Sequence, residues 1–253
     1  MSPTGRDVVV LSQDAAMQIS VSNLEIQYLR FIFKTSALHD HLISPGNRIR
    51  FGGGCNDVSA IIPQDSVAFA AALGAKAIRK TLESADGFIK VWRLDPETLD
   101  PRSFSTPIYP TQSITEEGWE VRVDDFILRQ LRNLRLDCLP NETGGILVGT
   151  YDMERRIIYV GDVIPSPPDS HEYPTAYIRG VSGVRDQLDE YGRVLGGAFT
   201  YIGEWHSHPN GASTSMSAAD IILFRWLQAH MSDEGLPALM GIVGEKNTSF
   251  FVK

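Results

Sequence analysis

Hydrophobic residues recur with two different periods near the middle of the chain. Residues 119–123, WEVRV, alternate between apolar and polar, which is typical of a strand with one buried face. In residues 124–141, DDFILRQLRNLRLDCLPN, the apolar positions approximate helical spacing instead, at Phe126, Leu128, Leu131, Leu134 and Leu136. This pattern predicts a strand followed by an amphipathic helix.

The rest of the second half continues to mix strands and helices. Residues 142–165 read as two strands joined by the polar turn at 152–156, which predicts a hairpin, and PSPPDSHEYP, residues 165–174, predicts a loop. We further expect helices at 177–194 and 217–232 and strands at 199–209, 237–245 and 248–253. This order predicts an α/β (α+β) fold in which a mixed sheet is flanked by helices.

The first half is predicted to form a smaller α/β region. The apolar runs at residues 8–11 and 28–33 indicate buried strand or helix segments, and residues 67–82 form the clearest predicted helix. Prolines are dense between residues 95 and 115 and disfavour both helix and central strand. We therefore predict an N-terminal region over 1–105, a linker over 106–118 and a second domain over 119–253.

Composition narrows the classes of function. The chain of 253 residues has a formal net charge of −8 and no basic stripe, which argues against a nucleic-acid partner. No apolar run reaches the roughly 20 residues needed to span a bilayer, and the N-terminal segment lacks the pattern of a signal peptide. We expect a cytoplasmic protein with no membrane partner. The isolated Cys55 and Cys138 suggest neither a disulfide framework nor a thiolate metal site.

Residues 203–220, GEWHSHPNGASTSMSAAD, concentrate groups that bind metals. On an extended strand, His206 and His208 project to the same face. Asp220 lies in the first turn of the predicted helix that follows, and Ser217 stands at the N-cap position three residues before it. Two imidazoles and a carboxylate are a ligand set that zinc prefers in catalytic sites, where water takes the fourth position.

This spacing, His-x-His-Pro followed after seven residues by Ser-x-x-Asp, resembles the JAMM motif of the JAB/MPN metalloproteases. The family's upstream glutamate has its counterpart in NETGGILVG, at Glu142. The resemblance covers about residues 119–253 and implies a JAB/MPN fold with one catalytic Zn²⁺ held by His206, His208 and Asp220. It further implies that Glu142 acts as the general base, that Ser217 stabilises the oxyanion, and that the substrate is a ubiquitin-like protein or its conjugates.

Other residues compete for these roles. Glu204, two residues before His206, is an alternative base, although we favour Glu142 and expect Glu204 to support an imidazole or to lie at the rim. Ser207 should face away from the ligands into the domain. His39 and His41 form a second His-x-His pair, but no carboxylate follows them at a useful spacing.

The first half is similar, over about residues 8–95, to the closing part of a ThiF-like adenylating domain. A Gly-rich phosphate-binding turn is missing, so the resemblance implies a partial or degenerate relative that docks a conjugation-pathway enzyme without activating ATP. Cys55 is more simply a buried structural cysteine than a thioester nucleophile.

Three functions follow from these patterns. The leading hypothesis is an isopeptidase that cleaves after the C-terminal glycine of a ubiquitin-like protein in a bacterial, antiphage-type conjugation system. The alternatives are an MPN-type scaffold with a structural zinc and a small-substrate metallohydrolase that acts on the C-terminus of a carrier protein.

Overall fold

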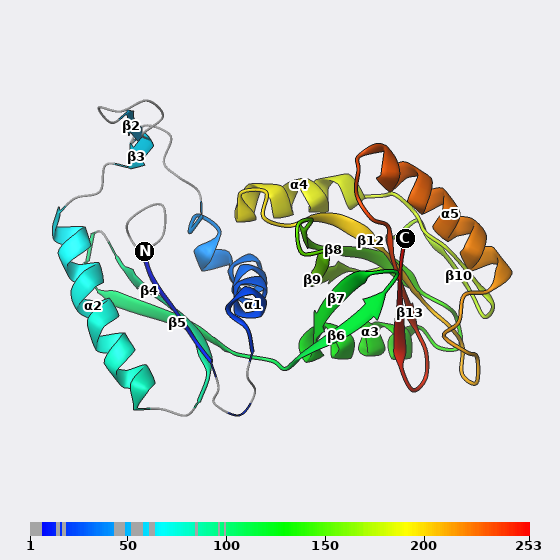
Figure 1. The fold of residues 1–253 in the computed structure, drawn as a ribbon, viewed down its shortest axis with the longest axis horizontal. Coiled ribbons are helices and arrows are strands. Elements are labelled where there is room, and N and C mark those ends of the chain that lie inside the picture. The colour runs from blue at the N-terminus through cyan, green and yellow to red at the C-terminus, as the bar shows by residue number, and fades with distance from the viewer. Residues whose placement is uncertain are drawn as a thin grey trace. The chain divides into compact units, whose positions relative to one another are not determined.

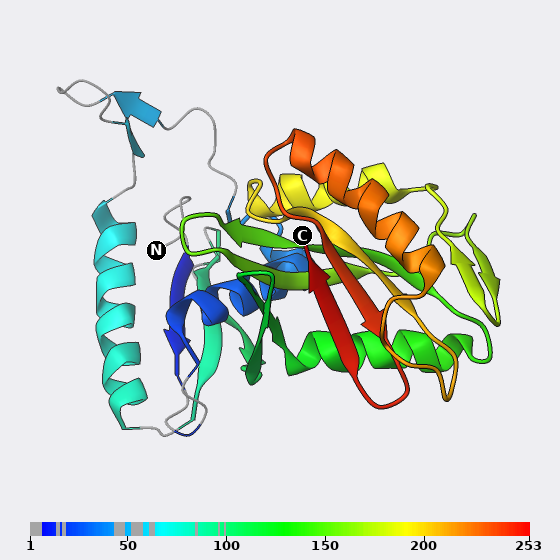
Figure 2. The ribbon, with the colours of Figure 1, turned by 45° about the vertical axis from the view of Figure 1, so that its right-hand side comes forward.

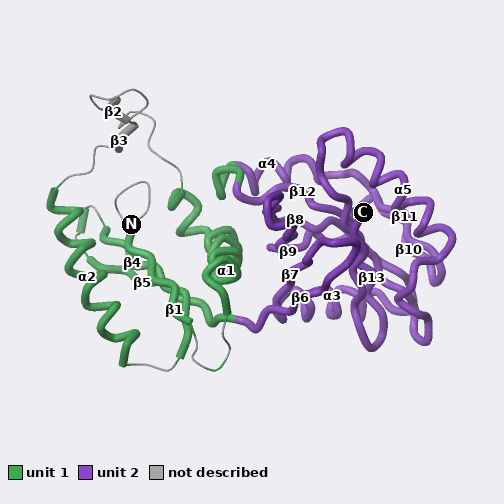
Figure 3. Tube along the Cα trace, in the orientation of Figure 1, with its two compact units in different colours: residues 1–108, 193–197 green, residues 109–192, 198–253 purple. Residues whose placement is uncertain are grey.

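The chain divides into two compact units (Figure 3), residues 1–108 with 193–197 and residues 109–192 with 198–253. The structure is a computed structural model. It describes residues 7–13, 16, 19–42, 49–51, 58–60, 64–83, 86–95, 97–98 and 100–253. One boundary between the units, at residues 108–109, lies inside the segment predicted as a linker, and the first unit also includes residues 193–197.

The first unit is built on a three-stranded antiparallel sheet of order β1-β4-β5 (Figure 1). Its strands are β1 (Asp7–Ser12), β4 (Phe88–Leu94) and β5 (Pro101–Pro107). The helical segments are α1 (Val21–Lys34), η1 (Ser36–Leu38) and α2 (Gln64–Leu82), and a separate pair consists of β2 (Ile49–Phe51) and β3 (Val58–Ala60). The first apolar run is therefore a strand and the second a helix, and the predicted helix at 67–82 is confirmed.

The proline-rich segment is a correction to the sequence-based prediction. It was expected to lack regular structure, yet it contains β5 and β6 (Thr111–Glu116). Each of these strands lies at the edge of its sheet, where a missing backbone N–H leaves no ladder bond unmade. Pro101 and Pro107 stand at the two ends of β5, and Pro110 directly precedes β6. Prolines excluded a central strand here, but not an edge strand.

The second unit is built on a seven-stranded mixed sheet of order β14-β13-β12-β8-β9-β7-β6. Its remaining strands are β7 (Trp119–Asp124), β8 (Gly144–Asp152), β9 (Ile157–Ile164), β12 (Thr200–Ser207), β13 (Leu239–Val243) and β14 (Thr248–Val252). Pairs β7–β9 and β12–β13 are parallel, and the other neighbours are antiparallel. The predicted hairpin at 142–165 is confirmed as β8 and β9.

Two helices pack on opposite faces of this sheet (Figure 2). The helix α3 (Asp125–Cys138) places Ile127 and Leu131 against Leu239 and Val243 of β13. The helix α5 (Ala218–Asp233) packs instead on Met240 and Ile242, which alternate with those residues along the same strand. A third helix, α4 (Val184–Leu195), and a small hairpin of β10 (His171–Tyr173) and β11 (Ala176–Ile178) complete the fold. No helix in the described part of the chain is both long and apolar enough to cross a membrane.

Candidate metal centre

Strand β12 carries His206, and His208 follows directly after its last residue, Ser207. His206 pairs with Ile242 of β13, whose side chain packs under α5, so the imidazole shares that face of the sheet. Trp205 points to the opposite face and joins the core under α3. Ser207 is fully buried on that side and its Oγ accepts a hydrogen bond from the amide of Thr143 at 2.9 Å, as the prediction of a structural role requires.

Asp220 reaches the histidines from the start of α5. Ser217 is the N-cap, and its Oγ accepts a hydrogen bond from the Asp220 amide at 3.2 Å. The Asp220 carboxylate returns the bond through Oδ2, which accepts from the Ser217 amide at 2.7 Å. This reciprocal capping box satisfies two amides of the first turn and fixes the carboxylate rotamer.

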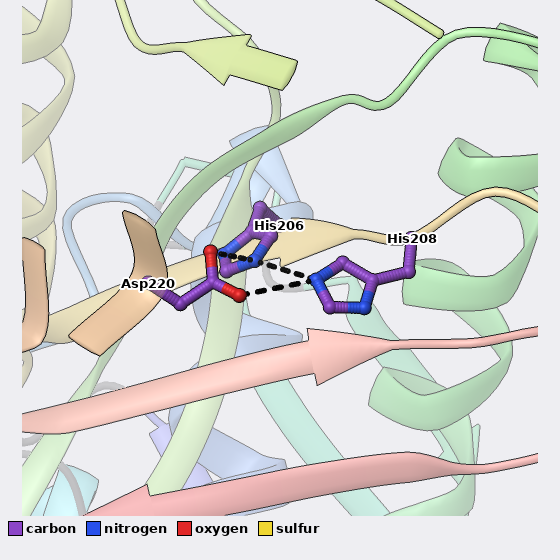
Figure 4. A group of neighbouring side chains, drawn as sticks. All are labelled: His206, His208 and Asp220. Carbon is purple, nitrogen blue, oxygen red and sulfur yellow. Dashed lines mark hydrogen bonds and ion pairs between the residues drawn. The ribbon is translucent and has the colours of Figure 1, made fainter. Parts of the chain in front are cut away.

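The three predicted ligands converge on one point (Figure 4). The two Nε2 atoms lie 3.3 Å apart, and Asp220 Oδ1 and Oδ2 lie 3.1 Å from His206 Nε2 and 3.3 Å from His208 Nε2, respectively. Ligand atoms around a tetrahedral zinc, with bonds of roughly 2.0–2.1 Å, are separated by about 3.3 Å. The spacing of the donor atoms therefore fits such an ion.

The tautomer of His208 supports the same conclusion. Its Nδ1 donates to the carbonyl oxygen of Ser213 at 2.6 Å, so the neutral ring presents its Nε2 lone pair to the cluster. A backbone acceptor of this kind is the usual partner of a metal-binding imidazole. Pro209, which follows at once, ends the extended segment and turns the chain toward the loop that supplies this carbonyl.

Electrostatics couple the three side chains. Burial acts to raise the pKa of Asp220, but hydrogen bonds from His206 and His208 outweigh it and hold that pKa well below its usual range. The carboxylate of Asp220 in turn raises the pKa of His208. Protons therefore compete with a metal ion for the same atoms, and metal affinity falls as the pH falls.

Glu142 lies beside this cluster because of the register between β8 and β12. Gly144 pairs with His206 in the antiparallel ladder. Two residues before Gly144 and two residues after His206, the same register places Glu142 opposite His208. The Ser207 amide donates to the Thr143 carbonyl at 2.7 Å and holds the two chains together there. Glu142 is 9% exposed, and this burial raises the pKa of its carboxyl above the ordinary value.

These groups line a cleft of about 640 Å³. Glu142, Ser217 and the three candidate ligands line it, together with residues of the β10–β11 hairpin and of α5. The hairpin contributes Ala176, Tyr177 and Ile178, and α5 contributes Leu223 and Trp226. The cleft thus combines a polar floor with apolar walls, as ligand sites commonly do.

The sequence analysis missed the hairpin that forms one wall. Residues 165–174 were interpreted as a loop, but they contain β10, whose partner β11 begins where a helix was expected. Each strand has only three residues, too few for a periodic signal. The helix expected from 177 begins only at Val184.

Glu204 has a different partner from the one expected. It was predicted to support an imidazole or to lie at the rim, but it is 6% exposed and its Oε1 accepts bonds from Arg179 Nε at 3.1 Å and Nη2 at 2.9 Å. These two bonds already engage the carboxylate of Glu204, so this contact disfavours Glu204 as the proton acceptor.

The two remaining histidine candidates belong to the first unit and have partners there. His41 is fully buried and contacts Asp7, and His39 Nε2 contacts the carbonyl oxygen of Phe33 at 2.8 Å. Cys55 falls outside the described residues. Within the described chain, His206, His208 and Asp220 form the one group with metal-binding geometry.

Comparison with known proteins identifies a family and two relatives of this chain. A family model described as prokaryotic homologs of the JAB domain matches residues 126–251. A protein of Enterobacter hormaechei named CD-NTase/cGAS isopeptidase is 36% identical over 134 residues, which are 52% of this chain and 72% of that protein. A "probable metalloprotease" of Sinorhizobium fredii is 29% identical over 79 residues, 31% of this chain and 48% of its own length.

A solution structure of a protein from Desulfitobacterium hafniense covers 51% of this chain and 79% of its own at 20% identity, with a TM-score of 0.33. That score is too low to bear on the fold. The family match spans both motifs, and together with the Enterobacter relative it confirms the resemblance predicted from them. The chain belongs to the family of prokaryotic homologs of the JAB domain.

Proposed function

We propose that this protein is a zinc-dependent peptidase that cleaves the amide bond after the C-terminal glycine of a ubiquitin-like protein, in a conjugate or in a precursor. The observation that carries the proposal is the convergence of a three-residue ligand set and the buried carboxyl of Glu142 in one open cleft. The names of the two relatives, an isopeptidase and a metalloprotease, support this reaction class. The bacterial conjugation system is the setting that we propose for it.

Proton transfer is assigned to Glu142. A zinc ion held by His206, His208 and Asp220 would supply Lewis acidity, which acidifies water and polarises a carbonyl group. Glu142, which faces these residues, takes a proton from water as a carboxylate and then delivers it to the leaving amine. Burial raises the pKa of Glu142, which makes its carboxylate a stronger base in the first step and lets it hold the proton until the amine leaves.

Ser217 is assigned to the oxyanion. Its Oγ accepts from the Asp220 amide, so the hydroxyl hydrogen remains available for donation to a substrate. Ser217 lines the cleft beside Asp220. A donor fixed by a helix cap needs little reorganisation when negative charge develops on the carbonyl oxygen.

The cleft favours an extended, glycine-ended substrate. Strand β11 pairs with β10 on one side only, and its residues line the cleft, so an incoming strand can bond to the open edge. The Tyr177 ring packs directly over Gly144, the residue paired with His206. This ring narrows the cleft next to the ligand set and favours residues without side chains at the cleaved bond.

The test uses ubiquitin and bacterial ubiquitin-like proteins, each fused through its terminal glycine to a fluorescent amine. We expect the zinc-loaded protein to release the amine, and both Glu142→Ala and chelator-treated protein to be inactive. Mass spectrometry of the product should show an intact protein ending in glycine. Activity that survives in Glu142→Ala would move the base to Glu204, and the release of a single amino acid would favour a small-substrate hydrolase. An inactive zinc-loaded wild type would favour a scaffold.

A further inference from the structure

Arg179 and Glu204 form an ion pair in the wall of the cleft. Glu204 stands on β12, two residues before His206 and on the same face of the strand. Arg179 directly follows β11, and both residues line the cleft. The guanidinium contacts Glu204 Oε1 through Nε and Nη2, and the Tyr201 hydroxyl donates to the same oxygen at 3.3 Å. The pair therefore joins the end of the hairpin to the strand that carries His206.

The hairpin is fastened at its other strand by separate bonds. The Tyr173 carbonyl of β10 accepts from the Glu142 amide at 2.8 Å. Glu172 accepts from the Thr143 hydroxyl at 2.6 Å and from the Cys138 thiol at 3.0 Å. These contacts attach β10 next to the proposed base, whereas the Arg179 contact attaches the chain directly after β11. The two attachments are thus placed to act on different parts of the reaction.

A buried pair of this kind is better at fixing geometry than at adding net stability. The Glu204 side chain is 9% exposed and that of Arg179 is 21% exposed, so both charges lose much of their hydration. This desolvation offsets much of the attraction, and an apolar pair of similar size is often equally stable. The guanidinium also donates through Nη1 to the Gly180 carbonyl at 2.9 Å, which orients its planar fork. What the pair determines is the distance between the edge of β11 and β12.

We propose that Arg179 and Glu204 are positioning residues which hold the edge of β11 at the correct distance from the ligand set to bind the substrate's extended tail. This inference rests on the proposed peptidase function and assigns the pair to substrate binding. The chemical step depends on Glu142, which keeps its own attachment to β10 through Tyr173. Breaking the ion pair should therefore raise KM and leave kcat nearly unchanged.

The experiment compares wild type with Arg179→Lys, the double variant Arg179→Met/Glu204→Gln, and Arg155→Ala as a matched control. The double variant removes both charges, so no buried carboxylate is left unpaired. The control breaks an exposed ion pair with Asp152 at the far end of β8. Each zinc-loaded protein is assayed with the ubiquitin fusion for kcat and KM, and by hydrogen exchange at the amides of β10 and β11.

We expect the double variant to show about a tenfold higher KM, equivalent to ~1.4 kcal/mol, and kcat within about twofold of wild type. Hydrogen exchange in β11 should become faster, while zinc content and exchange in β8 stay at wild-type values. Arg179→Lys keeps the charge but loses the planar fork, so its KM and its exchange rate in β11 should lie between those of wild type and the double variant. Arg155→Ala should match wild type in every measurement.

Two results would overturn the inference. One is unchanged exchange in β11, which would show that the pair does not hold the hairpin. The other is faster exchange with a normal KM, which would reduce the pair to a structural role. A wild-type protein that cleaves no fusion would refute the proposed peptidase instead, and the exchange measurement separates that failure from the first result.

Discussion

Two histidine–aspartate clusters, one in each unit, show what distinguishes a metal site from a structural ion pair. In the first unit, His41 Nδ1 lies 2.5 Å from Asp7 Oδ2, and both residues are fully buried. In the second, Asp220 faces His206 and His208 at 3.1 and 3.3 Å and opens onto the cleft. Both clusters unite an imidazole and a carboxylate, yet the atoms around them differ.

The difference lies in how the lone pairs are used. Arg93, paired with Asp7 across β1 and β4, donates to both carboxylate oxygens of Asp7 at 2.8 Å. The second nitrogen of His41 contacts the Tyr28 hydroxyl, so both ring nitrogens are engaged. In the second cluster, the Nε2 atoms of His206 and His208 face each other and the Asp220 carboxylate instead. A guanidinium completes the first cluster, and the second has the donor set that a cation would complete.

The largest expected effect separates the clusters by metal content. Asp220→Asn should reduce bound zinc from about one ion per chain to almost none, because the charged ligand is lost, and activity should fall by roughly 10³-fold or more. Asp7→Asn should keep its zinc. Elemental analysis of the two purified variants makes the comparison, and zinc loss in Asp7→Asn would show that the two units are coupled.

A second prediction concerns stability in the first unit. Arg93→Met leaves the buried Asp7 carboxylate without its guanidinium and should destabilise this unit by about 3–5 kcal/mol. The loss of unfolding free energy is measured by urea unfolding, monitored through hydrogen exchange at the amides of β1 and β4. Arg155→Ala, which breaks an exposed pair, should change stability by less than about 1 kcal/mol. Equal effects of the two substitutions would contradict the structural role of Arg93.

Ser217 allows a sharper test, because its hydroxyl has two roles. Ser217→Ala should lower kcat by about 10²-fold through loss of the oxyanion donor and should weaken the start of α5 by about 1 kcal/mol. Ser217→Gly removes the same hydroxyl but costs the cap only a few tenths of a kcal/mol. The two variants should therefore share one kcat and differ in thermal stability. A near-normal kcat in Ser217→Gly would limit the hydroxyl to capping.

The smallest expected effect is a displacement of the pH profile. Glu142 accepts a proton only as a carboxylate, so activity is lost as the pH falls through its pKa. Burial raises that pKa, which places the acid limb of kcat/KM above the ordinary glutamate value of about 4.3. Measurement at saturating zinc keeps ligand protonation from emptying the site. An acid limb at or below the ordinary value would argue against Glu142.

Local sequence was enough to predict that four of the candidate site residues come together, but not what surrounds them. His206, His208, Ser217 and Asp220 lie within fifteen residues, and strand alternation with helix capping already predicts that they meet. Glu142 lies 64 residues before His206, and its place was implied by the family resemblance alone. Only the register of β8 with β12 explains it physically.

Long-range pairs and short strands escaped the sequence analysis. The contact of Arg179 with Glu204 spans 25 residues and that of Arg93 with Asp7 spans 86, and neither has a local signal. The three-residue strands of the hairpin are too short to alternate visibly. The edge strands β5 and β6 were missed because the prolines were interpreted as a linker, whereas proline is excluded only from central strands. The adenylating-domain resemblance and the roles of the site residues stay predictions.

Because the capping box at the start of α5 includes a candidate ligand, metal binding would be coupled to the folding of the first turn of this helix. Ser217 Oγ and the Asp220 carboxylate cap the first turn of α5. Asp220 is also one of the three candidate ligands. If the first turn unwinds, the aspartate leaves the histidines, so the zinc ion that we propose would bind only the wound form. Each tenfold increase in free zinc above its dissociation constant would then stabilise the folded form of that turn by about 1.4 kcal/mol. Cellular zinc supply would thereby set how often this end of α5 frays.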